Sequence, residues 1–169
     1  MSELNFGKTV TLEQASNIIL STPMNRYLLQ GEPGIGKSSL LKTLGASLPN
    51  HEVAYIDVPN MDLGDIAMPV INHETKTTAY YPNTRFKVHT GKPVITMLDE
   101  FTKGAEPVKN MLHPMLNEPR MIMGIPLHKD TIVVTAGNYS GDGVGDNMMS
   151  HSRNRISVIS VKKPHAGFN

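Results

Sequence analysis

Hydrophobic and polar residues follow two periods along this chain, and these periods predict strands and helices in turn. Short apolar runs that end at glycine, proline or polar residues are typical of buried strands. Because helical patterns separate several of these runs, we predict an α/β fold with a mostly parallel sheet and helices on both faces. The five runs are RYLLQ (26–30), EVAYIDV (52–58), PVITMLDE (93–100), TIVVTAGN (131–138) and ISVISVK (156–162).

Helical periodicity marks three segments of the chain. In TLEQASNIILS, Thr11 and Gln14 form a capping box ahead of an apolar face. A second helix is expected to begin at Lys37. A third follows the run PVITMLDE, where Pro107 suits the first turn and Pro114 should kink or loosen the helix. The apolar positions are Leu40, Leu41, Leu44 and Leu48 in the second helix and Val108, Met111, Leu112, Met115 and Leu116 in the third.

The remaining segments carry weaker patterns. A hairpin is expected to turn at Gly124, and NMMSHSRNR (147–155) is expected to form a short helix. The segment from Pro59 to Pro93 is expected to be irregular, with one candidate strand in TTAYY (77–81). Three aromatic residues of this segment are expected to serve in packing: Tyr80, Tyr81 and Phe86.

Composition excludes several kinds of site. The chain of 169 residues has no cysteine, which rules out disulfides and thiolate metal ligands, and its seven histidines lack the spacing of zinc ligands. Its 16 basic and 15 acidic residues form no basic stripe, so nucleic acid is not indicated as a partner. Apolar runs stay well short of the ~20 residues that cross a membrane, and no signal-peptide core is seen. We therefore expect one cytoplasmic domain over residues 1–169, with no membrane contact.

The stretch GEPGIGKSS (31–39) carries the strongest chemical signal. Its glycines, lysine and serine fit G-x-x-x-x-G-K-[ST], between a predicted strand and a predicted helix. Glycines let successive backbone N–H groups surround a phosphate, which a helix N-terminus also attracts. Lys37 would neutralise the β/γ oxygens of ATP or ADP, and the Ser38 hydroxyl suits Mg²⁺. The alternative is a glycine-rich turn that binds nothing. The expected nucleotide contacts are Gly31, Glu32, Pro33, Gly34, Ile35, Gly36, Lys37, Ser38 and Ser39.

Two adjacent carboxylates end the third apolar run. Asp99 and Glu100 would lie at the carboxyl edge of the sheet, where open α/β sheets bind ligands. Buried carboxylates are costly without a cation, which Mg²⁺ bound to ATP would supply. Asp99 is therefore a candidate Mg²⁺ ligand, acting through water, and Glu100 a candidate to polarise the attacking water. Asn138 ends the next run, and its amide could donate to the γ-phosphate and hold a water. Solvated acids and a loop asparagine are the alternatives.

Together these segments resemble an AAA+ ATPase, and more narrowly the MoxR-type branch. The resemblance rests on GEPGIGKSS, VITMLDEFTKGAEPVKNMLHPMLNEPRMIMGIPL, TIVVTAGN and SRNRISVI, from about Arg26 to Val161. It implies a three-layer P-loop NTPase fold whose five strands have the order 5-1-4-3-2. It also implies that Asn138 is the sensor-1 residue. Arg155, with Arg153 as a second candidate, would reach the nucleotide of a neighbouring subunit in a ring, often a hexamer.

The resemblance also frames the possible functions. The family continues into a helical lid, whereas this chain stops at Asn169, so we expect a shortened version without the lid. MoxR-type relatives often work with von Willebrand A-domain proteins. The first hypothesis is an ATP hydrolase that oligomerises and remodels a partner protein or complex. The second is a nucleotide-gated scaffold with little hydrolysis. An AAA+ factor that acts on DNA and a small-molecule kinase are further alternatives.

Overall fold

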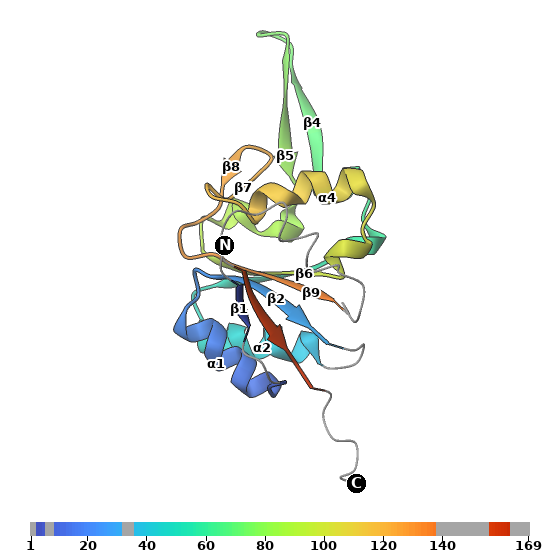
Figure 1. Ribbon diagram of the computed structural model, residues 1–169. Coiled ribbons are helices and arrows are strands. Elements are labelled where there is room, and N and C mark those ends of the chain that lie inside the picture. Colours follow the sequence, from blue (N-terminus) through green and yellow to red (C-terminus); the bar gives the residue numbers. More distant parts are fainter. Residues whose placement is uncertain (1–2, 6–8, 32–35, 138–155, 163–169) are drawn as a thin grey trace.

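Six parallel strands form the central sheet of the protein. The computed structural model describes residues 3–5, 9–31, 36–137 and 156–162. The strands lie in the order β1 (Glu3–Asn5), β10 (Ile156–Ser160), β2 (Arg26–Gln30), β9 (Ile132–Gly137), β6 (Val94–Asp99) and β3 (Glu52–Asp57), as Figure 1 shows. Every neighbouring pair in this sheet is parallel. The carboxyl ends of the strands therefore meet at one edge.

The five predicted strands are confirmed, and their order is the one that the resemblance implied. The sequence did not predict the sixth strand, β1, which adds to the edge of the sheet beside β10 with Glu3 opposite Ile156. Its three residues are too few to show an alternating pattern. Only the pairing partner, far along the chain, makes this segment a strand.

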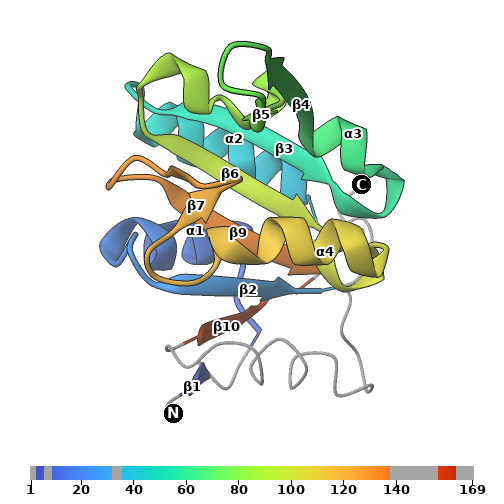
Figure 2. The same ribbon diagram turned by 90° about the horizontal axis from the view of Figure 1, so that it is seen from above.

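Helices cover both faces of the sheet, as the α/β pattern predicted. Helices α1 (Leu12–Ser21) and α2 (Lys37–Ser47) lie on one face, and α4 (Glu106–Leu112) lies on the other (Figures 1 and 2). The capping box is confirmed, because the Thr11 side chain accepts from the Gln14 N–H while the Gln14 side chain accepts from the Thr11 N–H. The short helix α3 (Leu63–Ile66) follows β3 and contacts α4.

Two apolar clusters hold the three layers together, one on each face of the sheet. Strand β6 contributes to both, because successive side chains point to opposite faces. Met97 joins the cluster under α1 and α2 with Leu40 and Leu44, whereas Leu98 joins the cluster under α4 with Leu112. Burial on both faces explains why this strand reads as a continuous apolar run.

Helix α4 ends earlier than the sequence predicted: Pro114 was expected only to kink or loosen it, and Met115 and Leu116, expected as helix positions, lie beyond its end. The helix stops at Leu112, and the chain continues as a 3₁₀ turn, η5 (His113–Met115), around Pro114. The expected hairpin at Gly124 is confirmed, with β7 (Met121–Ile122) antiparallel to β8 (Ile125–Pro126). The other 3₁₀ turns of the described residues are η1 (Val58–Asn60), η2 (Thr84–Phe86), η3 (Val88–Thr90) and η4 (Phe101–Lys103).

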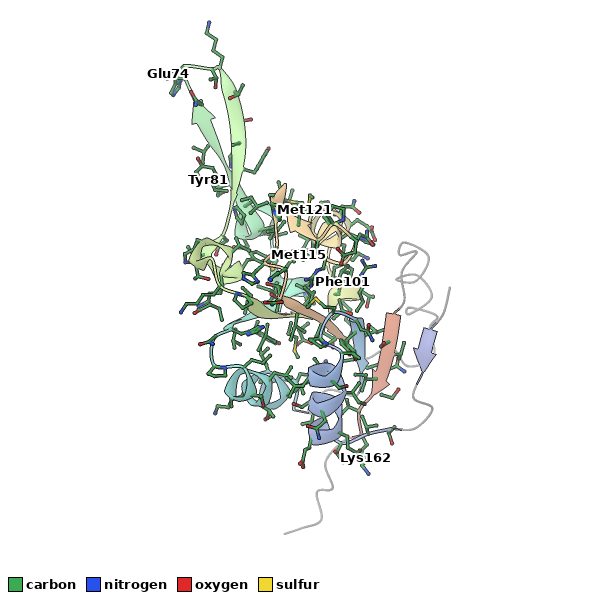
Figure 3. The ribbon with its side chains drawn as sticks, turned by 90° about the vertical axis from the view of Figure 1, so that its left-hand side faces the viewer. Glu74, Tyr81, Phe101, Met115, Met121 and Lys162 are labelled. Carbon is green, nitrogen blue, oxygen red and sulfur yellow. The ribbon has the colours of Figure 1, made fainter. Side chains whose placement is uncertain are left out.

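The segment expected to be irregular contains a two-stranded ribbon, so that prediction was wrong in part. Strand β4 (Ala67–Asn72) pairs antiparallel with β5 (Thr77–Pro82), which includes the candidate strand TTAYY. The ribbon projects from the body of the protein, with Glu74 near its tip (Figures 1 and 3). A ribbon that projects in this way exposes both of its faces to solvent.

Tyr80 and Tyr81 are not packing residues, contrary to the prediction from sequence. They are 47% and 60% exposed because they lie on the projecting ribbon, whereas Phe86 is buried as predicted. Alternation along a strand shows which residues share a face, but it cannot show whether another layer covers that face. The predicted helix over 147–155 lies outside the described residues.

Candidate functional site

The candidate site lies at the carboxyl edge of the sheet, where the chain passes from β2 into α2. The Gly31 N–H donates to the Gly137 carbonyl over 3.0 Å, which holds the end of β2 against the end of β9. Gly36 caps α2 with a left-handed backbone (φ 90°, ψ 36°). A Cβ at this position would lie 2.7 Å from Leu12 Cδ1. Both observations explain why glycine stands here.

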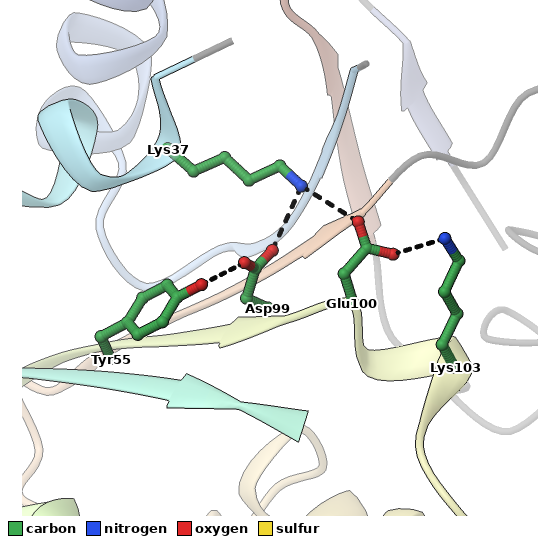
Figure 4. A network of polar contacts seen from close by, with 5 residues as sticks. All are labelled: Lys37, Tyr55, Asp99, Glu100 and Lys103. Atoms are coloured by element: carbon green, nitrogen blue, oxygen red, sulfur yellow. Dashed lines mark hydrogen bonds and ion pairs between the residues drawn. The ribbon is translucent and has the colours of Figure 1, made fainter. Parts of the chain in front are cut away.

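Lys37 connects the glycine–lysine motif with the acidic pair. Its Nζ lies 3.2 Å from Asp99 Oδ1 and 3.3 Å from Glu100 Oε1 (Figure 4). The three side chains are largely buried, with exposed fractions of 11% for Lys37, 13% for Asp99 and 19% for Glu100. Charges removed this far from water require close partners. The tertiary structure therefore assembles the cation and both acids that the two motifs predicted separately.

Glu100 has an unusual backbone for a residue with a side chain. Its φ of 53° is left-handed, and its N–H donates to the Ala136 carbonyl over 2.6 Å. A left-handed conformation costs about 1–2 kcal/mol outside glycine and persists when the surroundings hold it in place. Here it turns the chain at the end of β6, and Glu100 Oε2 lies 3.2 Å from Lys103 Nζ (Figure 4). The carboxylate of Glu100 thus lies between two ammonium groups.

Tyr55 is a member of this cluster that sequence reasoning missed. Its hydroxyl donates to Asp99 Oδ2 (Figure 4). The pKa of the Tyr55 hydroxyl is raised, first by desolvation and then by the hydrogen bond to Asp99 and by its charge. The hydroxyl is therefore protonated near neutral pH and can donate. The sequence signal was a tyrosine two residues before the end of the strand that pairs with β6.

An open groove lies between α2 and the edge strand β3. Ser38 and Ser39 are exposed there, and both line the groove together with Lys42 and Tyr55. The groove has a volume of about 700 Å³. Its lining comes from five residues of α2 and two of β3, so the groove runs along the side of α2 from its first turn.

The donor set fits Mg²⁺ with a nucleotide phosphate. Hydroxyl and carboxylate oxygens, such as those of Ser38 and Asp99, are the hard ligands that Mg²⁺ prefers. Gly36 lets the chain enter α2 with a left-handed backbone, and Lys37 provides a largely buried positive charge. These features can hold a phosphate beside a divalent cation.

Several predicted residues lie outside the described residues, and the structure places none of them. They are Glu32, Pro33, Gly34, Ile35, Asn138, Arg153 and Arg155. Their roles stay predictions.

Comparison with known proteins places the chain among known folds. The family described as "AAA domain (dynein-related subfamily)" matches residues 26–139. The crystal structure of a protein from Cytophaga hutchinsonii, named "putative ATPase", matches with a TM-score of 0.54 and 17% sequence identity. That match covers 92% of this chain and 48% of the other, so this chain spans about half the length of that protein. An identity this low shows the fold alone. No curated protein matches the sequence.

Membrane insertion has no support among the described helices. None of them combines the length and the apolar character that crossing a membrane requires.

Proposed function

The chain belongs to the family of AAA domains, dynein-related subfamily, and on this premise we propose that it binds ATP with Mg²⁺ and hydrolyses it to ADP and phosphate. The observation that carries the proposal is the contact of Lys37 with both Asp99 and Glu100 at the start of α2. This contact brings the phosphate-binding lysine to the two carboxylates that would serve the metal ion and the attacking water.

Each residue has a separate role in the proposed reaction. Lys37 would leave the acids and bind the β/γ oxygens of ATP, where it offsets negative charge. Ser38 and Asp99 would hold Mg²⁺, which when bound neutralises part of the phosphate charge. Glu100 would orient a water molecule and accept its proton as the water oxygen attacks the γ-phosphorus. The bond between the γ-phosphorus and the bridging β-phosphate oxygen breaks, and ADP leaves.

Substitution of Glu100 and Lys37 tests this assignment. Glu100→Gln should keep ATP binding but lower phosphate release by at least ~100-fold, the contribution typical of a general base. Lys37→Ala should lose ATP binding, measured by calorimetry with Mg²⁺ present. Wild-type hydrolysis by Glu100→Gln would show that Glu100 is not the base. If the unsubstituted chain bound no ATP, the proposed function itself would be wrong.

We further propose that the protein works as a ring, with the hexamer as the expected form, and follows the MoxR-type pattern. Arg155, with Arg153 as a second candidate, would enter the neighbouring subunit's site, where a guanidinium stabilises the transferring phosphoryl group. Phosphate release per subunit should then rise with protein concentration. In verified mixed rings, Arg155→Ala and Lys37→Ala should restore part of each other's activity. A rate that does not depend on concentration in a monomeric protein would contradict this proposal.

We propose that the ribbon of β4 and β5 contacts the partner protein that the ring remodels. Met68 and Ile71 on β4 are 59% and 61% exposed, and exposed apolar side chains of this size favour a protein surface as partner. The ribbon is not strongly basic, so its composition does not favour DNA. A von Willebrand A-domain protein is the candidate that the MoxR-type resemblance implies. The double variant Met68→Ser, Ile71→Ser should bind ATP normally and lose binding to that partner.

The second candidate function is a nucleotide-gated scaffold with little hydrolysis. One observation favours it: Glu100 contacts both Lys37 and Lys103, so both of its carboxylate oxygens already have ammonium partners. Such a scaffold would bind ATP and change its affinity for a partner without appreciable phosphate release. Single-turnover hydrolysis in the assembled protein separates the two functions.

A further inference from the structure

We infer that Tyr55 is a positioning residue for Asp99: its hydroxyl holds one carboxylate oxygen so that the other faces the start of α2, where Mg²⁺ would bind. The inference rests on the proposed binding of ATP with Mg²⁺, and it adds a residue that neither sequence motif contains.

The register of the sheet brings the two side chains together. Tyr55 lies opposite Met97 and Asp57 lies opposite Asp99, so Tyr55 and Asp99 are diagonal neighbours across β3 and β6. Residues opposite one another in a sheet, and those two positions further on, point to the same face. That face is the one on which Met97 packs with α2. A tyrosine is long enough to reach its diagonal neighbour, and its hydroxyl does so.

The two oxygens of Asp99 have different partners. Oδ2 accepts from the Tyr55 hydroxyl, and Oδ1 lies 3.2 Å from Lys37 Nζ (Figure 4). Tyr55 approaches from the edge strand, whereas Lys37 approaches from α2. With Oδ2 engaged, rotation of the carboxylate is restricted, and Oδ1 stays on the side of α2. Ser38, the other candidate Mg²⁺ ligand, lies in the first turn of that helix.

The placement of Tyr55 favours this role over simple packing. Its side chain is 45% exposed, so little apolar area is gained by burying its ring, yet its hydroxyl binds a carboxylate that is only 13% exposed. Tyr55 also lines the groove that Ser38 and Ser39 face. Tyr55 therefore contacts Asp99, one proposed metal ligand, and shares a groove with Ser38, the other.

Removal of the hydroxyl alone tests the inference. In Tyr55→Phe the ring stays, but Asp99 Oδ2 loses its donor. Loss of a partner that orients a metal ligand typically weakens metal affinity by 10–100-fold. Because the Tyr55 side chain is partly exposed, we expect about a tenfold rise in the Mg²⁺ concentration that half-saturates ATP binding. Calorimetry measures this with ATP at a series of Mg²⁺ concentrations, and again with ATP and EDTA.

Two comparison variants make the result specific. Tyr80→Phe removes a hydroxyl from a similarly exposed tyrosine on β5 and should match the unsubstituted chain. Asp99→Asn should shift the Mg²⁺ requirement further than Tyr55→Phe, which verifies that the assay reports on Asp99. ATP binding in EDTA should be the same for Tyr55→Phe and the unsubstituted chain. An effect on folding alone would change both measurements.

The possible failures are distinguishable. If the unsubstituted chain binds ATP with a clear Mg²⁺ requirement and Tyr55→Phe has the same requirement, the inference about Tyr55 is overturned and the proposed function stands. If the unsubstituted chain binds no ATP, the proposed function is overturned, and the role of Tyr55 with it.

A measurement on the tyrosine itself covers the case in which Tyr55→Phe does not fold. In protein with ring-labelled tyrosine, Asp99→Asn should shift the assigned NMR signal of Tyr55 and leave that of Tyr80 unchanged. An unchanged Tyr55 signal would also overturn the inference.

Discussion

Replacement of Gly36 by alanine is the sharpest test of how this glycine starts α2. Gly36 has a φ of 90°, which residues with a side chain rarely adopt, and a Cβ there would lie 2.7 Å from Leu12 Cδ1. The left-handed backbone costs a residue with a Cβ about 1–2 kcal/mol. The contact adds about 1 kcal/mol, at the low end for overpacking, because it falls on the end of a flexible side chain. We therefore expect Gly36→Ala to lower the free energy of unfolding by about 2–3 kcal/mol.

Gly91 offers a matched control for this estimate. Its φ of 73° is also left-handed, but nothing lies within 4 Å of an added Cβ. Gly91→Ala should therefore show the backbone cost alone, about 1–2 kcal/mol. Urea unfolding followed by circular dichroism measures both variants. In thermal unfolding, Gly36→Ala should lower Tm by about 5–10 °C for a chain of this size.

ATP binding separates the local effect of Gly36→Ala from its effect on stability. The variant should weaken ATP binding, because the strained turn displaces the backbone next to Lys37, whereas Gly91→Ala should bind ATP normally. If Gly36→Ala were no less stable than Gly91→Ala, the contact with Leu12 would play no part. If it also matched the unsubstituted chain in ATP binding, the whole account of this turn would be wrong.

Three further predictions follow from burial and charge. Leu44→Ala should lower the free energy of unfolding by about 2–5 kcal/mol in urea, because Leu44 is fully buried in the cluster under α1 and α2; a loss below about 1 kcal/mol would contradict that packing. Lys103→Ala should change the free energy of unfolding by less than about 1 kcal/mol, because its side chain is 59% exposed and exposed ion pairs contribute little. A larger loss in the same assay would show that its ion pair with Glu100 stabilises the fold more than an exposed pair does. Because the pKa of the Tyr55 hydroxyl is raised, its contribution to stability should be complete below the ordinary pKa of 10.0 and lost as pH rises through the folded-state pKa. The free energies of unfolding of the unsubstituted chain and of Tyr55→Phe, measured from pH 8 to about 11, should therefore converge as pH rises. A constant difference between them would contradict this prediction.

Local patterns were sufficient for five strands of the sheet and for the helices α1, α2 and α4. The apolar runs that form β2, β3, β6, β9 and β10 each consist of a few adjacent residues. Such a pattern is visible in the sequence itself. The capping box of α1 joins Thr11 and Gln14, only three residues apart. The glycine–lysine motif and the acidic pair were visible for the same reason. Each consists of neighbouring residues whose chemistry needs no distant partner to be recognised.

Only the tertiary structure decided which distant groups meet. Tyr55 and Asp99 are 44 residues apart, and Lys37 and Asp99 are 62 apart, so their contacts depend on strand order and register, which local pattern does not encode. The same holds for β1, which is a strand because β10 lies beside it, and for Tyr80 and Tyr81, which are exposed because β4 and β5 project from the body. The sequence by itself determined five strands of the sheet, the helices α1, α2 and α4, and the glycine–lysine and acidic groups of the candidate site. The pairing of these strands and site residues, and the exposure of their side chains, arose from long-range packing. Burial and hydrogen bonding depend on contacts between residues that are far apart in the sequence.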